Sequence, residues 1–158
     1  MRNQSKPLSR VHHETPWTRW VERPWGKELW YGLEIDDYVQ VIARTRDGRY
    51  PLVKQFRPAV GEVTVELVAG LVDGKENELE TAQRELREEA GLVGGDWTHL
   101  DTRYSDTGRL DNRVHTFVAL DVVFDSEFIE EEGVEPCFVD AETLESWVLE
   151  GRLSNAIQ

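Results

Sequence analysis

Residues 70–92 read GLVDGKENELETAQRELREEAGL. Strong helix formers fill positions 78–90 of this stretch, and they predict a helix of that length. Asn77 stands before it as a candidate N-cap, Glu80 completes a capping box, and Gly91 follows as a C-terminal stop. The stretch therefore predicts a loop that leads into a helix with well-marked ends.

The predicted helix has an apolar face and an acidic face. At about 100° per residue, one side carries the apolar residues Leu79, Ala82, Leu86 and Ala90. Glu85, Glu88 and Glu89 fall within an arc of about 100° on another side. Like charges three and four residues apart repel by a few tenths of a kcal/mol per pair, so a divalent cation would offset the repulsion. A solvated acidic face in an acidic chain is the alternative.

The order and spacing of the polar residues in this stretch are specific. Gly70 is followed after five residues by Glu76, after seven more by the run Arg84–Glu89, and then by Gly91. This pattern resembles the Nudix box of hydrolases that act on nucleoside diphosphates linked to another group. At residue frequencies of about 5–8%, chance agreement at seven positions has a probability on the order of 10⁻⁸, which disfavours a plain acidic helix.

The resemblance extends beyond the box. The segments Gln55-Phe56-Arg57-Pro58 and 65–70 are similar to those that precede the box in ADP-ribose pyrophosphatases and related nucleoside diphosphate sugar hydrolases. The resemblance implies an α+β fold, an α/β/α sandwich with a mixed β-sheet between helices, over about residues 16–158. A small N-terminal β element at about 16–45 would mediate a homodimer, after a flexible tail at 1–15.

The resemblance also implies a set of metal ligands. Glu85 and Glu89, one turn apart, are spaced to hold Mg²⁺ through oxygen, with Mn²⁺ as a substitute, and Glu88 is the third ligand or an outer carboxylate. In the family the carbonyl before the box glycine, here that of Ala69, is also a ligand. Arg84 can orient a carboxylate without competing as a ligand, because guanidinium only donates hydrogen bonds. Glu88 and Arg84 are therefore counted with the catalytic groups.

Three residues outside the box are candidate substrate contacts. In the subfamily the arginine at the position of Arg57 contacts the diphosphate, and a glutamate near the active site corresponds to Glu66. For both residues an ordinary ion pair is the alternative. Trp30 or Trp20 is a candidate platform for a nucleobase, reached from the other subunit of a dimer. The alternative is that these tryptophans are core and interface residues.

An acidic loop supplies candidates for the general base. The run Glu130-Glu131-Glu132 lies where these enzymes place a mobile loop with a glutamate that acts as, or assists, the general base. The alignment favours Glu132, and a solvated acidic loop is the alternative.

Thr107 stands where ADP-ribose pyrophosphatases usually have proline, which weakens ADP-ribose as the substrate.

The expected reaction is hydrolysis of the diphosphate linkage of a nucleoside diphosphate sugar, foremost ADP-ribose, which gives AMP and ribose 5-phosphate. One alternative is another nucleoside diphosphate derivative, such as GDP-mannose, UDP-glucose or a dinucleotide. The other is an inactive, nucleotide-sensing Nudix domain, against which the intact carboxylate trio argues. The preferred base and sugar and the number of metal ions stay open.

Composition limits the partners. Lys and Arg total 18 against 31 Asp and Glu, a net charge of −13, so nucleic acid and anionic membrane surfaces are disfavoured. No apolar run reaches the roughly 18 to 20 residues of a transmembrane helix, and the N-terminus is too polar for a signal peptide. Cys137 is the single cysteine, which excludes an intrachain disulfide and fits a reducing, cytoplasmic setting.

Strands are expected on both sides of the helix. Runs of β-branched, aromatic and aliphatic residues predict them at 28–34, 38–45, 51–56, 63–69, 98–104, 114–124 and 137–139. Asp47-Gly48 predicts a hairpin turn, because glycine tolerates positive φ. A second helix is expected at 142–150, and Ala156 and Ile157 look like the start of another.

Overall fold

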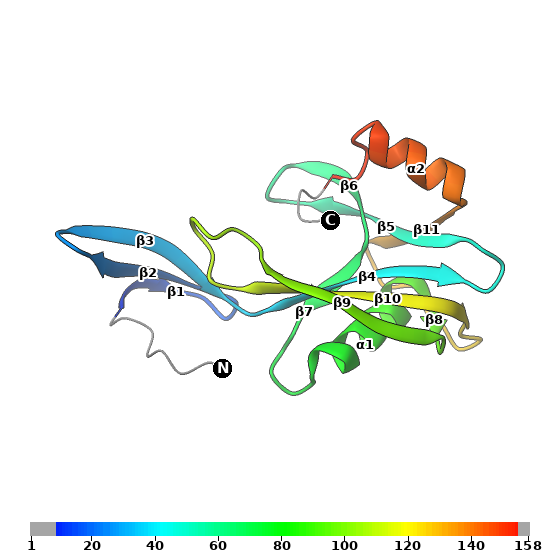
Figure 1. Ribbon diagram of the computed structural model, residues 1–158, viewed down its shortest axis with the longest axis horizontal. Helices are drawn as coiled ribbons and strands as arrows, with labels where there is room; N and C mark the ends of the chain where they lie inside the picture. Colours follow the sequence, from blue (N-terminus) through cyan, green and yellow to red (C-terminus); the bar gives the residue numbers. More distant parts are fainter. Residues whose placement is uncertain (1–8, 155–158) are drawn as a thin grey trace.

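The computed structural model describes residues 9–154, which form two helices and three sheets. The helices are α1 (Glu78–Ala90) and α2 (Ala141–Leu149). The strands are β1 (Arg10–Glu14), β2 (Thr18–Trp25), β3 (Glu28–Ile35), β4 (Tyr38–Thr45), β5 (Tyr50–Arg57), β6 (Glu62–Glu66), β7 (Val68–Leu71), β8 (Leu92–Val93), β9 (Asp96–Tyr104), β10 (Arg113–Phe124) and β11 (Val134–Val139). α1 and α2 lie on opposite sides of the sheets (Figure 1). The expected α/β/α sandwich is therefore confirmed.

The central sheet is mixed. Its strands lie in the order β7-β4-β10-β8, and β9 also pairs with β10. β4 and β10 run parallel, with Val41 opposite Phe117, whereas the other pairs in this sheet are antiparallel. A second, antiparallel sheet has the order β11-β5-β6. The strands β1, β2 and β3 form a third sheet that projects from the rest of the molecule (Figure 1).

Two apolar cores lie on the two sides of the sheets. Neighbouring residues of β5 belong to different cores, Val53 to the core under α1 and Leu52 to the core beside α2, because successive strand side chains point to opposite faces. The apolar face expected for α1 is confirmed at its centre, where Leu86 is fully buried. Leu79, at the first turn of α1, is instead 38% exposed.

Both ends of α1 follow from their local signals, and the expected range 78–90 is confirmed. The side chain of Asn77 accepts a hydrogen bond of 3.0 Å from the Glu80 N–H, and the Glu80 carboxylate accepts one of 2.9 Å from the Asn77 N–H. Gly91 has a φ of 65°, which favours glycine. A Cβ at Gly91 would also lie 2.5 Å from the ring of Phe128, so the chain can turn here only with glycine.

The single strand expected at 63–69 is wrong in one respect, because it divides into β6 and β7 at Leu67. Glu66 pairs with β5, whereas Val68 pairs with β4. The apolar run is continuous, so only the pairing partners reveal the break. The segment passes from one sheet to another here, and this passage brings Ala69 beside α1.

The N-terminal region contains more strand than expected. The flexible tail expected at 1–15 is wrong in its second part, because β1 already pairs with β2 from Arg10 onward. Every side chain of β1 is exposed, so the segment lacks the apolar alternation by which a strand is recognised. Backbone pairing forms the strand, together with an ion pair of 2.8 Å between His12 Nε2 and Glu22 Oε2.

The turn expected at Asp47-Gly48 forms, but the expected hairpin is wrong, because β4 and β5 pair with other strands in different sheets. The bounds of the remaining expected elements agree to within a few residues. β2 lies within the β element expected at about 16–45, and β8 was not anticipated. Residues 1–8 of the expected tail, and the helical start expected at Ala156 and Ile157, lie outside the described residues. Within residues 9–154, neither helix combines the length and apolar character that crossing a bilayer requires.

Candidate active site

The carboxylate of Glu85 lies directly against the backbone of Gly70. Gly70 is in β7 and pairs with Val39 of β4, and a Cβ built on it would lie 2.0 Å from Glu85 Oε1. Any side chain at this position would therefore occupy the space of the carboxylate. The spacing between the box glycine and the helix reflects this contact between a strand and the helix that follows it.

Glu89 is the most buried carboxylate of the helix. It is only 7% exposed, and its Oε2 accepts a hydrogen bond of 3.1 Å from the Ala69 N–H. Burial is the main cause that raises the pKa of Glu89 to about 8; the Ala69 hydrogen bond opposes the rise, and the nearby charges of Glu85 and Glu131 add to it. Burial also raises the pKa of Glu85. Both carboxyls are thus held where a negative charge is costly unless a cation compensates it.

Arg84 joins three carboxylates. Its Nε donates to Glu76 at 2.9 Å, and its Nη1 donates to Glu85 and to Glu88, both at 2.8 Å. Burial alone would lower the pKa of Arg84, but hydrogen bonds and charges from Glu76, Glu88 and Glu85 raise it well above its ordinary value. The guanidinium therefore stays charged and holds the loop residue Glu76 over the helix.

The donor set suits a hard divalent cation. Glu85 and Glu89 present carboxylate oxygens beside the backbone of Ala69, which is the oxygen chemistry that Mg²⁺ prefers. Within residues 9–154, no three His, Cys, Asp or Glu side chains are gathered around one point as a metal site. The side chain of Glu88 is 51% exposed and bonded to Arg84. The residues fit a cation held by two carboxylates, a backbone oxygen and water, an arrangement that Mg²⁺ commonly accepts.

Arg57 and Glu66 are bonded to each other. Arg57 Nε and Nη2 donate to the two carboxylate oxygens of Glu66 at 2.9 and 2.7 Å, and Thr64 Oγ1 donates to the same carboxylate at 2.6 Å. Glu66 is 3% exposed. Burial and the charge of Glu66 together raise the pKa of Tyr38 to about 12. No signal in the sequence pointed to Tyr38, because its position beside Glu66 depends on how two strands of different sheets meet.

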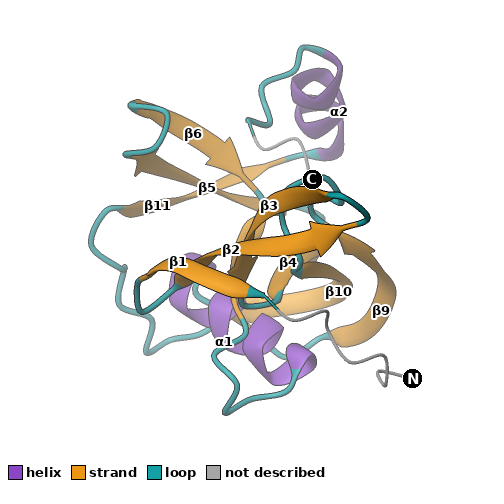
Figure 2. Cartoon of the chain, turned by 90° about the vertical axis from the view of Figure 1, so that its left-hand side faces the viewer, coloured by secondary structure: helices purple, strands orange, loops and turns teal. Residues whose placement is uncertain are grey.

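Trp30 belongs to β3, a strand of the projecting sheet, which extends to one side of α1 in Figure 1 and faces the viewer in Figure 2. Its indole N–H donates to the carbonyl of Gly108 at 3.1 Å, and it lines a hollow of about 310 Å³ together with Thr107 and Arg109. The structure therefore brings Trp30 to the loop that contains Thr107, the residue that stands where ADP-ribose pyrophosphatases usually have proline. It does not bring Trp30 to the carboxylates of the same chain.

The acidic loop faces β5 and β6. Glu130, Glu131 and Glu132 line an open hollow of about 580 Å³ together with Lys54 and Phe56. Of the three glutamates, only Glu131 is among the principal charges that raise the pKa of Glu85 and of Glu89. Glu131 is therefore the loop glutamate whose charge acts most strongly on the carboxylates of α1.

Taken together, the fold and this cluster define an α/β/α domain organised around an acidic helix suited to a divalent cation. A family model described as NUDIX domain matches residues 36–155, which is more than half of the chain. The chain belongs to this family, and the resemblance inferred from residues 70–92 is confirmed.

Several characterised proteins are similar to parts of the chain. The ADP-ribose pyrophosphatase of Bacillus subtilis is 38% identical over 81 residues, which are 51% of this chain and 44% of that protein. The ADP-ribose pyrophosphatase of Mycobacterium tuberculosis is 39% identical over 83 residues, 51% of this chain and 40% of that protein. The matched segments thus span less than half the length of these relatives.

A solved structure supports the fold. The crystal structure of an ADP compounds hydrolase superposes with a TM-score of 0.72, at 18% identity, over 95% of this chain and 86% of that one. At this level of identity the similarity concerns the arrangement of helices and strands.

Proposed function

We propose that this chain hydrolyses the diphosphate linkage of a nucleoside diphosphate sugar in a Mg²⁺-dependent reaction, with ADP-ribose as the first candidate substrate. The observation that carries the proposal is the contact of Gly70 with Glu85, next to the hydrogen bond from Ala69 to Glu89. These contacts hold the buried carboxylate of Glu89 and the half-buried one of Glu85 at one strand end, where they suit a cation. The similarity to two ADP-ribose pyrophosphatases supports the choice of substrate.

In the proposed reaction water attacks one phosphorus, the bridging P–O bond breaks, and ADP-ribose yields AMP and ribose 5-phosphate. A bound divalent cation would supply charge neutralisation and water activation. Glu85, Glu89 and the Ala69 carbonyl would hold it, while Arg84 would keep Glu85 and Glu76 oriented. Glu85 and Glu88 both bond to Arg84, but the side chain of Glu88 is 51% exposed against 13% for that of Glu85, so the catalytic role expected for Glu88 becomes a weaker one in this proposal.

Two substrate contacts belong to the proposal. Arg57 has its Nη1 outside the fork with Glu66, so it can bind a phosphate oxygen without giving up that pair. Glu66 would then serve to orient Arg57. Trp30 would contact the nucleobase of a substrate bound to a second copy of the chain.

A cytoplasmic location is also proposed, which fractionation of the source cells would test.

An assay with a panel of substrates tests the function. ADP-ribose, GDP-mannose, UDP-glucose and a dinucleotide are each incubated with Mg²⁺ or Mn²⁺, and nucleoside monophosphate is quantified. We expect release of AMP from ADP-ribose that EDTA abolishes. Hydrolysis of another member at a higher kcat/KM would reassign the substrate. Tight binding of a nucleotide with no turnover under any condition would instead identify a sensor.

The loop glutamates are expected to differ in effect. We propose Glu131 as the residue that accepts or positions the proton of water, rather than the alignment-favoured Glu132, because its charge acts on Glu85 and Glu89. Glu131→Gln is expected to lower kcat about 10²-fold or more, the usual contribution of a general base. Glu130→Gln is the matched control. A larger loss in Glu132→Gln would return the role to Glu132.

We further propose a homodimer formed through the projecting sheet. Strand register places Trp20, Leu29, Tyr31 and Leu33 on one of its faces, and each is between 36% and 51% exposed. Contiguous exposed apolar surface of this kind marks an interaction site. The double variant Trp20→Ser/Tyr31→Ser is expected to elute as a monomer in chromatography with light scattering, whereas Trp17→Ser keeps the dimer. A monomeric wild-type protein would contradict the proposal.

A further inference from the structure

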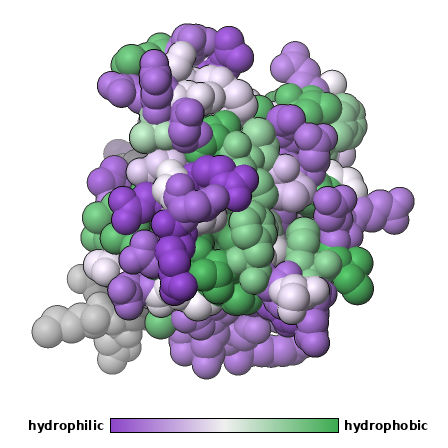
Figure 3. Space-filling model, turned by 90° about the vertical axis from the view of Figure 1, so that its right-hand side faces the viewer, coloured by the Kyte–Doolittle hydropathy of each residue, from purple (hydrophilic) through white to green (hydrophobic). Residues whose placement is uncertain are grey.

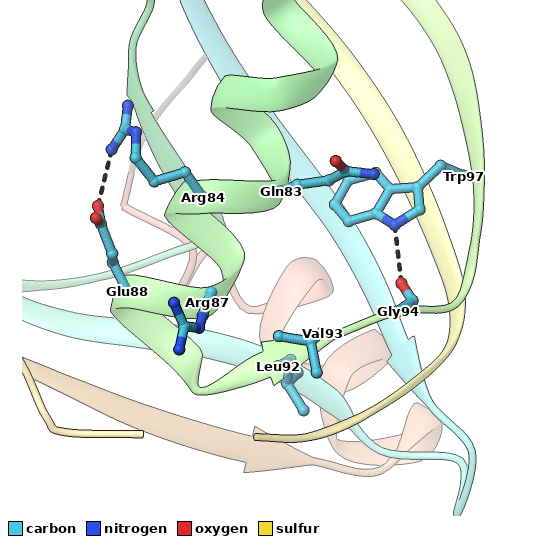
Figure 4. Close-up of a pocket in the computed structure, with 8 residues that line it drawn as sticks. All are labelled: Gln83, Arg84, Arg87, Glu88, Leu92, Val93, Gly94 and Trp97. Atoms are coloured by element: carbon cyan, nitrogen blue, oxygen red, sulfur yellow. Dashed lines mark hydrogen bonds and ion pairs between the residues drawn. The ribbon is translucent and has the colours of Figure 1, made fainter. Parts of the chain in front are cut away.

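A pocket of about 420 Å³ opens between α1 and the segment that joins β8 to β9 (Figure 4). Its size lies within the range of about 300–1,000 Å³ typical of small-molecule sites. Gln83 and Arg87 of α1 line one side, Leu92 and Val93 lie along the base, and Trp97 of β9 lines the other side. The pocket therefore combines an aromatic ring, an apolar floor and polar groups, which is the usual composition of a ligand site.

The indole of Trp97 is held in one orientation. Its N–H donates to the carbonyl of Gly94 at 2.9 Å, and its ring meets Phe117 edge-on, with 6.4 Å between the ring centroids. Gly94 has a φ of 72° and Gly95 a φ of 78°, so the turn that positions Trp97 depends on glycine at two successive positions. An immobilised aromatic ring loses little entropy when a planar ligand stacks on it.

Arg87 supplies a cationic group of which only the Nε has a hydrogen-bond partner among the described contacts. Within the described residues it has one ion-pair partner, Asp125, which its Nε meets at 2.7 Å. The side chain is 55% exposed, and its two Nη groups can therefore donate to an anion. Arg84, on the other side of the pocket, differs because three carboxylates already engage it. Glu88, also at the edge, has its charge compensated by Arg84.

Other exposed apolar surface does not combine an aromatic ring, an apolar floor and an arginine in one pocket. The end of the molecule at the turn between β4 and β5 shows a band of hydrophobic surface between hydrophilic residues (Figure 3). Among the half-exposed apolar residues, Phe124 packs on Phe138, and the guanidinium of Arg49 lies over both rings. These rings already pack against each other and against Arg49, although Phe124 is 51% exposed, and no pocket with polar groups is formed beside them by the contacts described.

We propose that this pocket binds a nucleoside monophosphate, with the base against the Trp97 indole and the phosphate on Arg87, at a place that adjoins the carboxylate cluster through Arg84 and Glu88 but does not include Glu85 or Glu89. The ligand class follows from an aromatic ring and an arginine fork that face one pocket of nucleotide size. Gln83, which extends from α1 toward Trp97 (Figure 4), is placed to hydrogen-bond the edge of the base. The inference does not depend on the proposed hydrolysis.

Calorimetric titration of the metal-free protein with AMP in EDTA tests the site. EDTA removes any cation that would hold phosphate at Glu85 and Glu89, and the Arg87 and Trp97 variants then assign the heat to the pocket. We expect saturable binding of AMP, with weaker binding of adenosine and of inorganic phosphate. Arg87→Gln and Trp97→Leu are each expected to weaken AMP binding about tenfold or more, from the lost charge-assisted bond and the lost stacking.

Matched variants separate this site from the proposed function. Arg103→Gln, which removes an exposed arginine of β9 outside the pocket, is expected to leave AMP affinity unchanged. Glu85→Gln is expected to leave it unchanged also, although it would stop hydrolysis. Unaltered AMP affinity in Arg87→Gln, or no saturable binding at millimolar AMP, would overturn the proposal whatever the result of the hydrolysis assay.

A measurement on the wild-type protein covers the case in which a variant fails to fold. The indole N–H resonance of Trp97, assigned with Trp97→Phe, is expected to shift on addition of AMP in EDTA. A resonance that stays in place while calorimetry detects AMP binding would put the nucleotide elsewhere and overturn the assignment.

Discussion

Glu89→Gln is expected to lower kcat/KM for ADP-ribose by about 10³-fold or more. Loss of a carboxylate that holds a catalytic cation forfeits several kcal/mol of transition-state stabilisation, and about 4 kcal/mol corresponds to 10³ in rate. The substitution keeps the size of the side chain and an oxygen that can accept the hydrogen bond from Ala69. The measurement is steady-state release of AMP with Mg²⁺.

The same substitution is expected to stabilise the metal-free protein at alkaline pH. Burial raises the pKa of Glu89 from its ordinary 4.5 to about 8, so between these values the folded protein keeps a proton that the unfolded chain has released. Stability conferred by the protonated carboxyl therefore falls as pH rises from about 4.5 to about 8. Glutamine does not ionise, and Glu89→Gln in EDTA should lose less stability over this window in urea titrations.

Glu145→Gln is the matched control for both measurements, because it removes an exposed carboxylate from α2 on the opposite side of the sheets. It is expected to change neither the rate nor the pH profile. If Glu89→Gln keeps more than about a tenth of the wild-type rate, the loss of transition-state stabilisation is too small for a metal ligand, and the role proposed for Glu89 is excluded.

Gly70→Ala is expected to reduce activity by about 10²-fold while the protein stays folded. The added methyl group would overlap the carboxylate of Glu85, 2.0 Å from its Oε1. That carboxylate is the end of a flexible side chain, so it can move aside at little cost in folding free energy. A displacement of about 1 Å in a catalytic group is enough for a loss of this size. Activity and the midpoint of thermal unfolding are measured together.

Gly74→Ala is the control in the same loop. Gly74 has a φ of 78° and open space around it, so alanine there strains the backbone without approaching Glu85. We expect Gly74→Ala to lose more stability than Gly70→Ala and to keep most of its activity. Equal loss of activity in the two variants would show that loop distortion, and not displacement of Glu85, is responsible.

Several features of the fold and the site were predictable because they are local. The ends of α1 depend on Asn77, Glu80 and Gly91, which interact with residues less than two turns away. The apolar and acidic faces depend only on helical periodicity. The partners in tertiary contacts could not be read in this way. For Arg57 and Glu66 an ordinary ion pair was the alternative interpretation, and the structure shows such a pair, but that each is the other's partner depends on β5 and β6 being neighbours.

The break at Leu67 and the strand β1 illustrate two further limits. An apolar run has the same pattern whether it stays in one sheet or passes to another, so the passage of residues 66–68 between sheets left no signal. Four of the five residues of β1 are polar, and its backbone pairing with β2 leaves no trace in the side-chain pattern.

The amino-acid sequence by itself determined the capped acidic helix, the spacing from Gly70 to Glu89 and the membership of a family, because these are properties of order along the chain. Only the tertiary structure decided that Glu89 is buried, that Glu88 is exposed, and that Glu76, Glu85 and Glu88 all bond to Arg84. It also decided which loop glutamate acts on Glu85 and Glu89, and that Trp97 and Arg87 share one pocket. Burial and charge act through space, and they depend on where folding brings segments distant in sequence together.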